Sequence, residues 1–296
     1  MINAFGLKIH EIKDVLQDEA VETHVRKTLA SVLKHLGILD KKSNQIIDEC
    51  LTRAKSYVYI SQYELHTHQI LENEGVTREV PKKLTGRSET IYEQIKPYLL
   101  SGSVLDLGCG DGKIGVMCTQ DGHQVDLIDV YRHPNIDNTS LDFKIFEQAT
   151  QVPVSDNQYN NTLVLTVFHH SDDPVKTIRE SYRVTKPNGR VLIIESVYGV
   201  TGEELSEAER EKNKSFFSLN QEQQRMANIF FDHFYNRVIH YSIDPKTKVN
   251  VPFNFNTPDN WKEIFENEGF KQEAVIHLGI DQPTAPEYHT LHVLRK

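Results

Sequence analysis

The chain of 296 residues is 38% hydrophobic and 25% charged, and its formal net charge is −9. These values predict a folded protein with one large domain or two, and they argue against long disorder. The negative charge disfavours nucleic acid as a partner, because its field repels phosphate backbones. The three cysteines lack CxxC spacing and indicate neither a disulfide framework nor a thiolate metal site. With no secretory signal and no run of about 20 apolar residues, we expect a cytoplasmic protein without a membrane partner.

The first 85 residues are expected to form a helical region. Apolar residues recur at helical spacing in three stretches, 11–36, 44–54 and 57–71. The next segment, 75–86, is polar and basic and contains Pro81, which predicts a linker ahead of a helix over 88–100.

From residue 104 the pattern changes to short apolar or β-branched runs that alternate with helix-length segments. The expected strands are 104–107, 124–128, 143–146, 163–167 and 190–195. Such alternation predicts a parallel sheet with helices on both faces. The pattern stops over 201–257, which is charged, helical and rich in aromatic residues, and which we expect to be an inserted helical cap. A helix over 258–268 and strands over 273–278 and 288–294 then complete the sheet.

A glycine-rich turn follows the first expected strand. It contains Gly108, Cys109, Gly110 and Gly112, and a helical pattern begins directly after it. Three glycines in five residues let the chain turn tightly and let a ligand approach bare backbone at a helix N-terminus. A tight structural turn is the alternative, but the carboxyl ends of strands are where open α/β sheets bind ligands. The spacing G-x-G-x-G departs from the G-x-G-x-x-G of dinucleotide-binding folds, which argues against an NAD-dependent oxidoreductase.

Asp129 ends the second expected strand. A carboxylate accepts hydrogen bonds from two hydroxyls at once, as the diol of a ribose requires, and this architecture places such a group here. A solvated aspartate at a strand end is the alternative.

These features resemble the class I S-adenosylmethionine-dependent methyltransferases, in the small-molecule branch called type 11 or ubiquinone/menaquinone-biosynthesis-like. The resemblance covers roughly 88–200 and has five parts in order, which are the glycine turn, Asp129, 148–157, 163–170 and 183–190. It implies a Rossmann-like α/β fold, a doubly wound and mostly parallel seven-stranded sheet. The methyltransferase domain would comprise 86–200 and 258–296, beside the N-terminal helical region 1–85 and the cap 201–257.

The resemblance also implies S-adenosyl-L-methionine as cofactor and transfer of its methyl group, by in-line displacement, to a small organic acceptor. The glycine turn would hold the methionine part, with Asp106 near its ammonium group. Asp129 would bind the ribose. Gln148 and Ala149 stand where the family usually has Asp-Ala against adenine, and the Gln amide still offers an acceptor for the adenine amine.

His169 and His170 follow the fourth expected strand, the position from which this fold commonly faces the methyl group. With an unperturbed pKa of about 6.5, a histidine here is a candidate to take a proton from the acceptor. The alternative is that one of the two caps the helix that follows.

The candidates for an acceptor pocket lie in the helical regions. They are Tyr59, Tyr63, His233, Tyr235 and Arg237. Plain helix packing is the better explanation for the aromatic residues, and a surface salt bridge is an equal alternative for Arg237. The polar segment 281–289 is either a substrate loop or a stiff hairpin, and the residues leave that choice open.

We expect no metal site, because the closely spaced histidine pairs, His66 with His68 and His289 with His292, project to different sides of their elements. The N-terminal helices are expected either to close over the cofactor or to form a homodimer contact. A catalytically idle module that binds the cofactor and uses the cap for a partner is the alternative to an enzyme.

Overall fold

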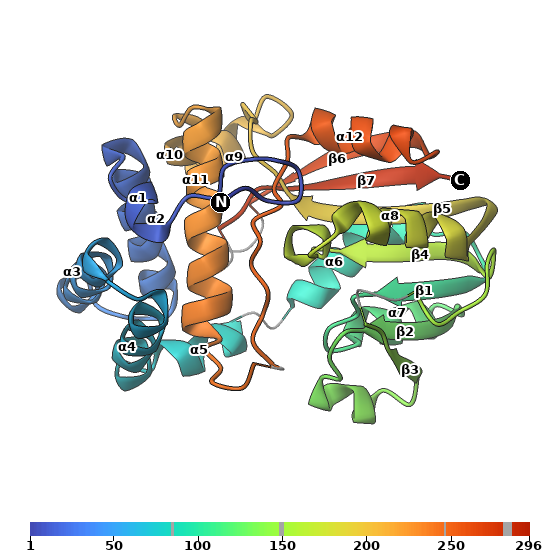
Figure 1. Cartoon of the computed structure of the whole chain (residues 1–296), viewed down its shortest axis with the longest axis horizontal. Coiled ribbons are helices and arrows are strands. Elements are labelled where there is room, and N and C mark those ends of the chain that lie inside the picture. The colour runs from blue at the N-terminus through green and yellow to red at the C-terminus, as the bar shows by residue number, and fades with distance from the viewer. Residues whose placement is uncertain (84–85, 148–150, 246, 281–285) are drawn as a thin grey trace. The chain divides into compact units, whose positions relative to one another are not determined.

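The computed structural model describes residues 1–83, 86–147, 151–245, 247–280 and 286–296. The chain divides into two compact units. The helical unit comprises Met1–Thr85, Val197–Phe255 and Leu278–Tyr288, and the sheet unit comprises Gly86–Ser196, Asn256–His277 and His289–Lys296. Each unit is therefore assembled from three separate stretches of chain (Figure 1).

The sheet has seven strands in the order β3-β2-β1-β4-β5-β7-β6. They are β1 (Ser103–Leu107), β2 (Gln124–Asp129), β3 (Asp142–Ile145), β4 (Tyr159–Leu165), β5 (Thr185–Ser196), β6 (Lys271–Gly279) and β7 (His289–Arg295). The first five pair in parallel with their neighbours, and β7 runs antiparallel to β5. This arrangement confirms the predicted Rossmann-like α/β fold.

The helices of the sheet unit are α6 (Arg87–Ile95), η1 (Lys96–Tyr98), α7 (Lys113–Gln120), η2 (Pro134–Asn138), η3 (Phe168–His170), α8 (Pro174–Val184) and α12 (Pro258–Asn267). Both α8 and α12 begin at side-chain caps. Before α8, the Asp173 side chain accepts the amide of Lys176 at 2.9 Å, and Thr257 caps α12 in the same way. One turn apart on α12, Trp261 and Phe265 are buried and stack at 5.5 Å. Both rings pack on Phe168, which joins α12 to the end of β4.

The helical unit has one hydrophobic core that both of its long stretches share. Its elements are α1 (Ile12–Val15), α2 (Glu19–His35), α3 (Asp40–Ser56), α4 (Ile60–Asn73), α5 (Val76–Lys83), α9 (Glu207–Lys212), α10 (Lys214–Phe217), α11 (Gln221–His233) and the π-helix η4 (Phe234–Ile239). Val25 and Leu29, one turn apart on α2, belong to the same buried cluster as Phe230 and Phe231 of α11. Among the described residues, no helix is both long enough and apolar enough to cross a membrane.

Two local expectations about the N-terminal region were wrong. The first long helix is interrupted, because the Asp18 side chain accepts the amides of Ala20 and Val21 and so starts a new helix, α2. The segment expected as a linker forms α5 instead. Val76 and Val80 lie one turn apart on α5 and are buried, an apolar face that the neighbouring polar residues hid in the sequence.

Candidate functional site

Two backbone hydrogen bonds connect the glycine turn to the adjacent strand β2. The amides of Gly108 and Cys109 both donate to the carbonyl of Ile128, at 2.7 and 3.2 Å. The amide of Gly112 then donates to Cys109 at 2.9 Å and closes the turn ahead of α7. The carboxyl ends of β1 and β2 therefore meet at this turn, as the parallel register requires.

The glycines of this turn differ in what surrounds them. All three have positive φ, at 82°, 52° and 77° for Gly108, Gly110 and Gly112. A Cβ on Gly108 would lie 2.4 Å from Cγ2 of Val167, and one on Gly112 would lie 2.9 Å from Cδ1 of Ile136. A Cβ on Gly110 would meet none of the residues that the structure describes within 4 Å. Two glycines are thus needed for packing, whereas Gly110 presents its backbone to open space, as a ligand cradle would.

Asp129 lies against this cradle. Its Oδ2 accepts the amide of Gly110 at 2.8 Å, and its Oδ1 accepts the amide of Val130 at 2.7 Å. Oδ1 also accepts the amide of Tyr131 at 3.4 Å. Burial raises the pKa of the Asp129 carboxyl, and the three amides act in the opposite direction. A carboxylate has about four acceptor positions, so Oδ2 retains capacity for a ligand hydroxyl.

Asp106, on β1 just before the turn, is a buried carboxyl with an incomplete set of hydrogen bonds. It is 2% exposed, and among the described residues its Oδ2 has no hydrogen-bond partner. Burial raises the pKa of Asp106 to about 7, and the nearby charges of Asp129 and Asp111 add to the rise. A buried carboxylate without a counter-charge is costly, so this position favours a cationic ligand group such as an ammonium.

The other residues predicted to bind the cofactor have different outcomes. Cys109 is buried within the turn, and burial holds the pKa of its thiol well above the usual range, so it is not a thiolate. Gln148 and Ala149 lie outside the described residues.

A buried carboxylate that the sequence analysis missed fixes His169. Glu195, at the end of β5, is fully buried, and its Oε2 lies 2.6 Å from Nδ1 of His169. Its Oε1 accepts the amides of Val167 and Phe168 at 2.9 and 2.6 Å. The available signal was a charged residue directly after the apolar run 191–194.

The loop that carries the two histidines is conformationally strained. Thr166, which follows β4, has a φ of 60°, an outlier for a β-branched residue and a feature that clusters at functional sites. His169 is 3% exposed, and His170 is half-buried with its ring centroid 4.0 Å from that of His169. The alternative that a histidine caps the next helix is wrong, because Asp173 caps α8.

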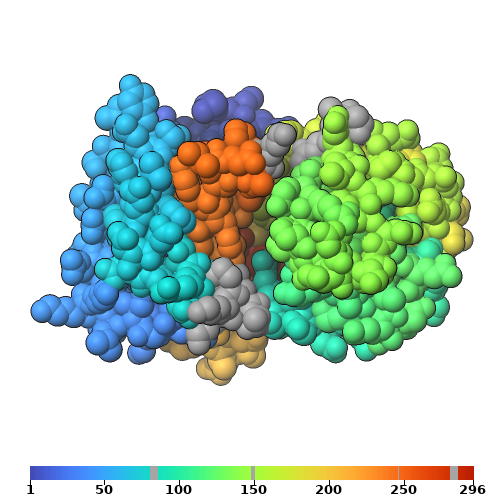
Figure 2. All heavy atoms as spheres, turned by 90° about the horizontal axis from the view of Figure 1, so that it is seen from below, coloured from blue at the N-terminus to red at the C-terminus, as the bar shows by residue number. Residues whose placement is uncertain are grey.

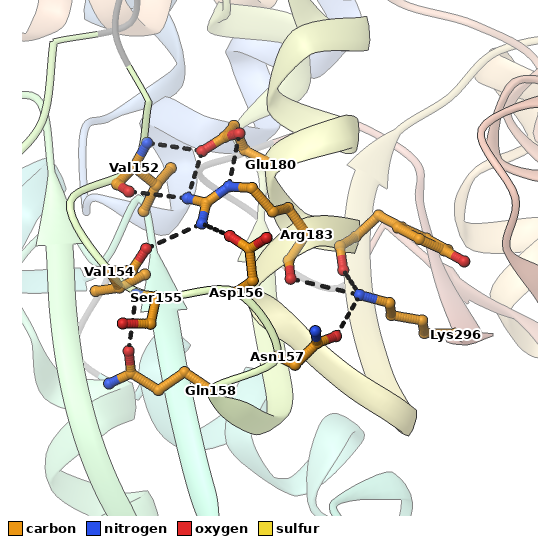
Figure 3. Close-up of polar contacts among 10 residues, drawn as sticks. Val152, Val154, Ser155, Asp156, Asn157, Gln158, Glu180, Arg183 and Lys296 are labelled. Atoms are coloured by element: carbon orange, nitrogen blue, oxygen red, sulfur yellow. Dashed lines mark hydrogen bonds and ion pairs between the residues drawn. The ribbon is translucent and has the colours of Figure 1, made fainter.

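Arg183 of α8 connects two parts of the family resemblance, 148–157 and 183–190 (Figure 3). Its guanidinium donates to the carbonyls of Val152 and Val154, each at 2.9 Å, and to Asp156 at 2.6 Å. Glu180 pairs with Arg183 at 2.8 Å and accepts the amide of Val152 at 2.7 Å. Arg183 and Glu180 thus hold the segment that follows Gln148 and Ala149 in the chain.

Three of the five candidates for acceptor binding gather around Glu64 in the helical unit. Glu64 is 1% exposed, and its Oε1 lies 3.2 Å from Nε2 of His233 and 3.1 Å from Nη2 of Arg237. Tyr63 stacks on His233 with centroids 5.9 Å apart. Lys248 completes the cluster, 2.9 Å from Glu64, where the segment around 240–255 (orange) lies beside the helices of 40–80 (blue to cyan) in Figure 2.

The remaining two candidates lie apart from this cluster. Tyr59 precedes α4 and is 64% exposed. Tyr235 makes an edge contact with His240, with ring centroids 4.7 Å apart.

Residues 105–193 match the family model of the methyltransferase domain. This stretch is similar to methyltransferase domains. It contains the glycine turn, Asp129 and the loop of His169 and His170. Together with the sheet order, the match confirms the family resemblance found in the sequence, and with it the expectations of an enzyme and of S-adenosylmethionine as cofactor.

Solved structures with this fold are distant in sequence. A Thermotoga maritima protein described as a possible histamine N-methyltransferase is 14% identical, covers 77% of this chain and 97% of its own, and has a TM-score of 0.48. The 1,6-didemethyltoxoflavin-N1-methyltransferase of Burkholderia thailandensis, solved with S-adenosylhomocysteine, is 13% identical, covers 71% of this chain and 76% of its own, and has a TM-score of 0.45. A SAM-dependent methyltransferase of Methanosarcina mazei is 15% identical, covers 68% of this chain and 96% of its own, and has a TM-score of 0.46. No curated protein matches the sequence.

Proposed function

We propose that this enzyme transfers a methyl group from S-adenosylmethionine to a small organic acceptor, with the cofactor held at the glycine turn of the sheet unit. The observation that carries the proposal is the geometry of three groups. Among the described residues, the backbone of Gly110 faces open space and the neighbouring Asp106 carboxyl has an oxygen without a partner, while the Asp129 carboxylate accepts the Gly110 amide.

Each of these groups suits a different part of the cofactor, which supplies a methyl group on a positively charged sulfur. Asp129 would accept a hydroxyl of the ribose, because its Oδ2 has spare acceptor capacity. Asp106 would place negative charge near the ammonium of the methionine part. Gly110 and its neighbours in the turn would let the backbone approach that part closely.

His169 is our candidate for the group that removes a proton from the acceptor. In a neutral imidazole one nitrogen carries hydrogen and the other accepts. Because Glu195 accepts two backbone amides through Oε1, its Oε2 is suited to accept the Nδ1 hydrogen of His169. Nε2 is then the nitrogen that takes the proton, and Glu195 acts as a positioning residue. His170 is the second candidate, and positioning with exclusion of water would add to the rate in either case.

Nitrogen-15 NMR of histidine side chains tests this arrangement without knowledge of the acceptor. We expect His169 in the Nδ1–H form in the wild type and in a mixture of forms in Glu195→Gln, whose amide can either donate or accept. The Nε2–H form in the wild type would contradict the role given to His169.

The acceptor-binding role of Tyr59, Tyr63, His233, Tyr235 and Arg237 also remains a proposal. Tyr63, His233 and Arg237 are the stronger candidates of the five, because they meet at one buried charge cluster.

Calorimetry with S-adenosylhomocysteine, the demethylated product, tests the proposed cofactor site on the full-length protein. We expect a single saturable site per chain, and no saturable binding of NAD, whose fingerprint needs a glycine at position 113 where this chain has lysine. Binding of NAD in place of S-adenosylhomocysteine would overturn the proposal.

A further inference from the structure

A hollow with polar and apolar walls opens on the helical unit, and none of the described residues that line it belongs to the charge cluster at Glu64. Its volume is about 130 Å³, room for several waters or for a small ligand group. Lys27, Thr28 and Ser31 line it from α2, and Lys212 and Ser215 line it from α9 and α10. His24 belongs to the same wall.

The described residues that line this hollow carry charge of one sign. They include Lys27 and Lys212 and no aspartate or glutamate. Within the described part of the chain neither lysine forms an ion pair, whereas Lys13, Lys42 and Lys55 of the same unit each pair with a glutamate. In a protein of net charge −9, two lysines without an ion pair among the described residues favour an anion at this hollow.

His24 gives a second and independent sign of a ligand. It is 4% exposed, and its ring packs between Phe216 and Phe231 at 5.7 and 6.0 Å. Nδ1 lies 3.0 Å from the Ser215 hydroxyl, while Nε2 is buried and has no partner among the described residues. A buried ring nitrogen without a partner costs about 1–3 kcal/mol, which a ligand in the hollow would recover.

We propose that this hollow binds a small oxyanion, a carboxylate or phosphate group of a ligand. Lys27 and Lys212 supply the charge, and the hydroxyls of Thr28 and Ser31 supply further donors. When the Ser215 hydroxyl donates to Nδ1 of His24, Nε2 carries the hydrogen and becomes one more donor. Within the described ranges of the chain, none of the residues that line the hollow belongs to the glycine turn.

An NMR titration of the backbone amides tests this site on the full-length protein at constant ionic strength. The probes are inorganic phosphate and, separately, acetate. We expect saturable shifts at Thr28, Ser31 and Ser215 with at least one of the two anions. The anion that saturates decides between phosphate and carboxylate.

Two variants and a matched control show whether the lysines bind the anion. Lys27→Gln and Lys212→Gln should each weaken binding by about three- to tenfold, the effect of one solvent-screened charge-assisted hydrogen bond. Lys34→Gln removes an exposed lysine from the same helix, α2, and should leave binding unchanged. The proposal is wrong if neither anion gives saturable shifts, or if the control weakens binding as much as the two variants do.

Discussion

Among single residues, the glycines of the turn after β1 show how similar positions serve different purposes. Gly108 is needed because Val167 occupies the space of a side chain, and Gly110 leaves its backbone uncovered. The spacing of the glycines is visible in the sequence, but the difference between them is not. It depends on Val167, which comes from another strand end nearly 60 residues later.

Alanine variants at these two positions should therefore fail in different ways. Gly108→Ala adds a clash to a positive φ and should lower the free energy of unfolding by roughly 2–4 kcal/mol. Gly110→Ala has only the strain of the positive φ, about 1 kcal/mol, but puts a methyl group into the cradle and should abolish binding of S-adenosylhomocysteine. Urea denaturation and calorimetry measure the two effects, and equal losses of stability would contradict this account.

The carboxyl of Asp106 makes stability depend on pH. Its pKa is raised from 3.8 to about 7 in the folded protein, so the folded state holds the proton more tightly than the unfolded chain does. This contribution is fully present below about pH 4 and is lost as the pH rises toward 7. The free energy of unfolding should thus fall across this range by on the order of 1.4 kcal/mol per pKa unit, and by clearly less in Asp106→Asn. Identical pH profiles for the two proteins would contradict the assignment.

At the scale of elements, the existence of α8 could be predicted from the sequence, but the contacts of its side chains could not. The alternation of strands and helix-length segments predicted a helix between the strands expected at 163–167 and 190–195, and α8 confirms it. The role of Arg183 was not predicted, because its partners are backbone carbonyls of a distant loop and leave no pattern in the chain. Glu195 was missed although it directly follows an apolar run, because that run does not show that its partners are backbone amides and a histidine of the loop after β4. Helix α5 was not predicted because Val76 and Val80, the buried valines of its apolar face, are too few to give a clear helical periodicity.

Two arginines on α8 offer a matched test of the loop contact. Arg183→Ala removes bonds to Val152, Val154 and Asp156 and should lower the free energy of unfolding by about 1–3 kcal/mol. Arg179→Ala breaks an exposed pair with Glu268 and should cost less than about 1 kcal/mol. Hydrogen exchange should become faster at residues 152–156 only in Arg183→Ala. Unchanged exchange there would show that Arg183 does not hold the loop.

At the scale of the whole molecule, the alternation of strands and helices was enough to predict the sheet. The same alternation did not predict that the N-terminal helices and the residues after β5 share one hydrophobic core. Periodicity within one helix shows that it has an apolar face but does not show which partner covers that face. The buried cluster at Glu64 was hidden in the same way, because its members come from α4, η4 and the segment that follows.

The central claim is that a carboxylate at the end of β2 holds the nucleoside of the cofactor, and Asp129→Ala tests it most directly. Calorimetry with S-adenosylhomocysteine should show binding weaker by about one to two decades, since each charge-assisted hydrogen bond contributes roughly 1.5–3 kcal/mol before water compensates. Asp142→Ala removes an exposed carboxylate from the neighbouring strand β3 and should bind as the wild type does. An unchanged dissociation constant in folded Asp129→Ala would contradict the claim.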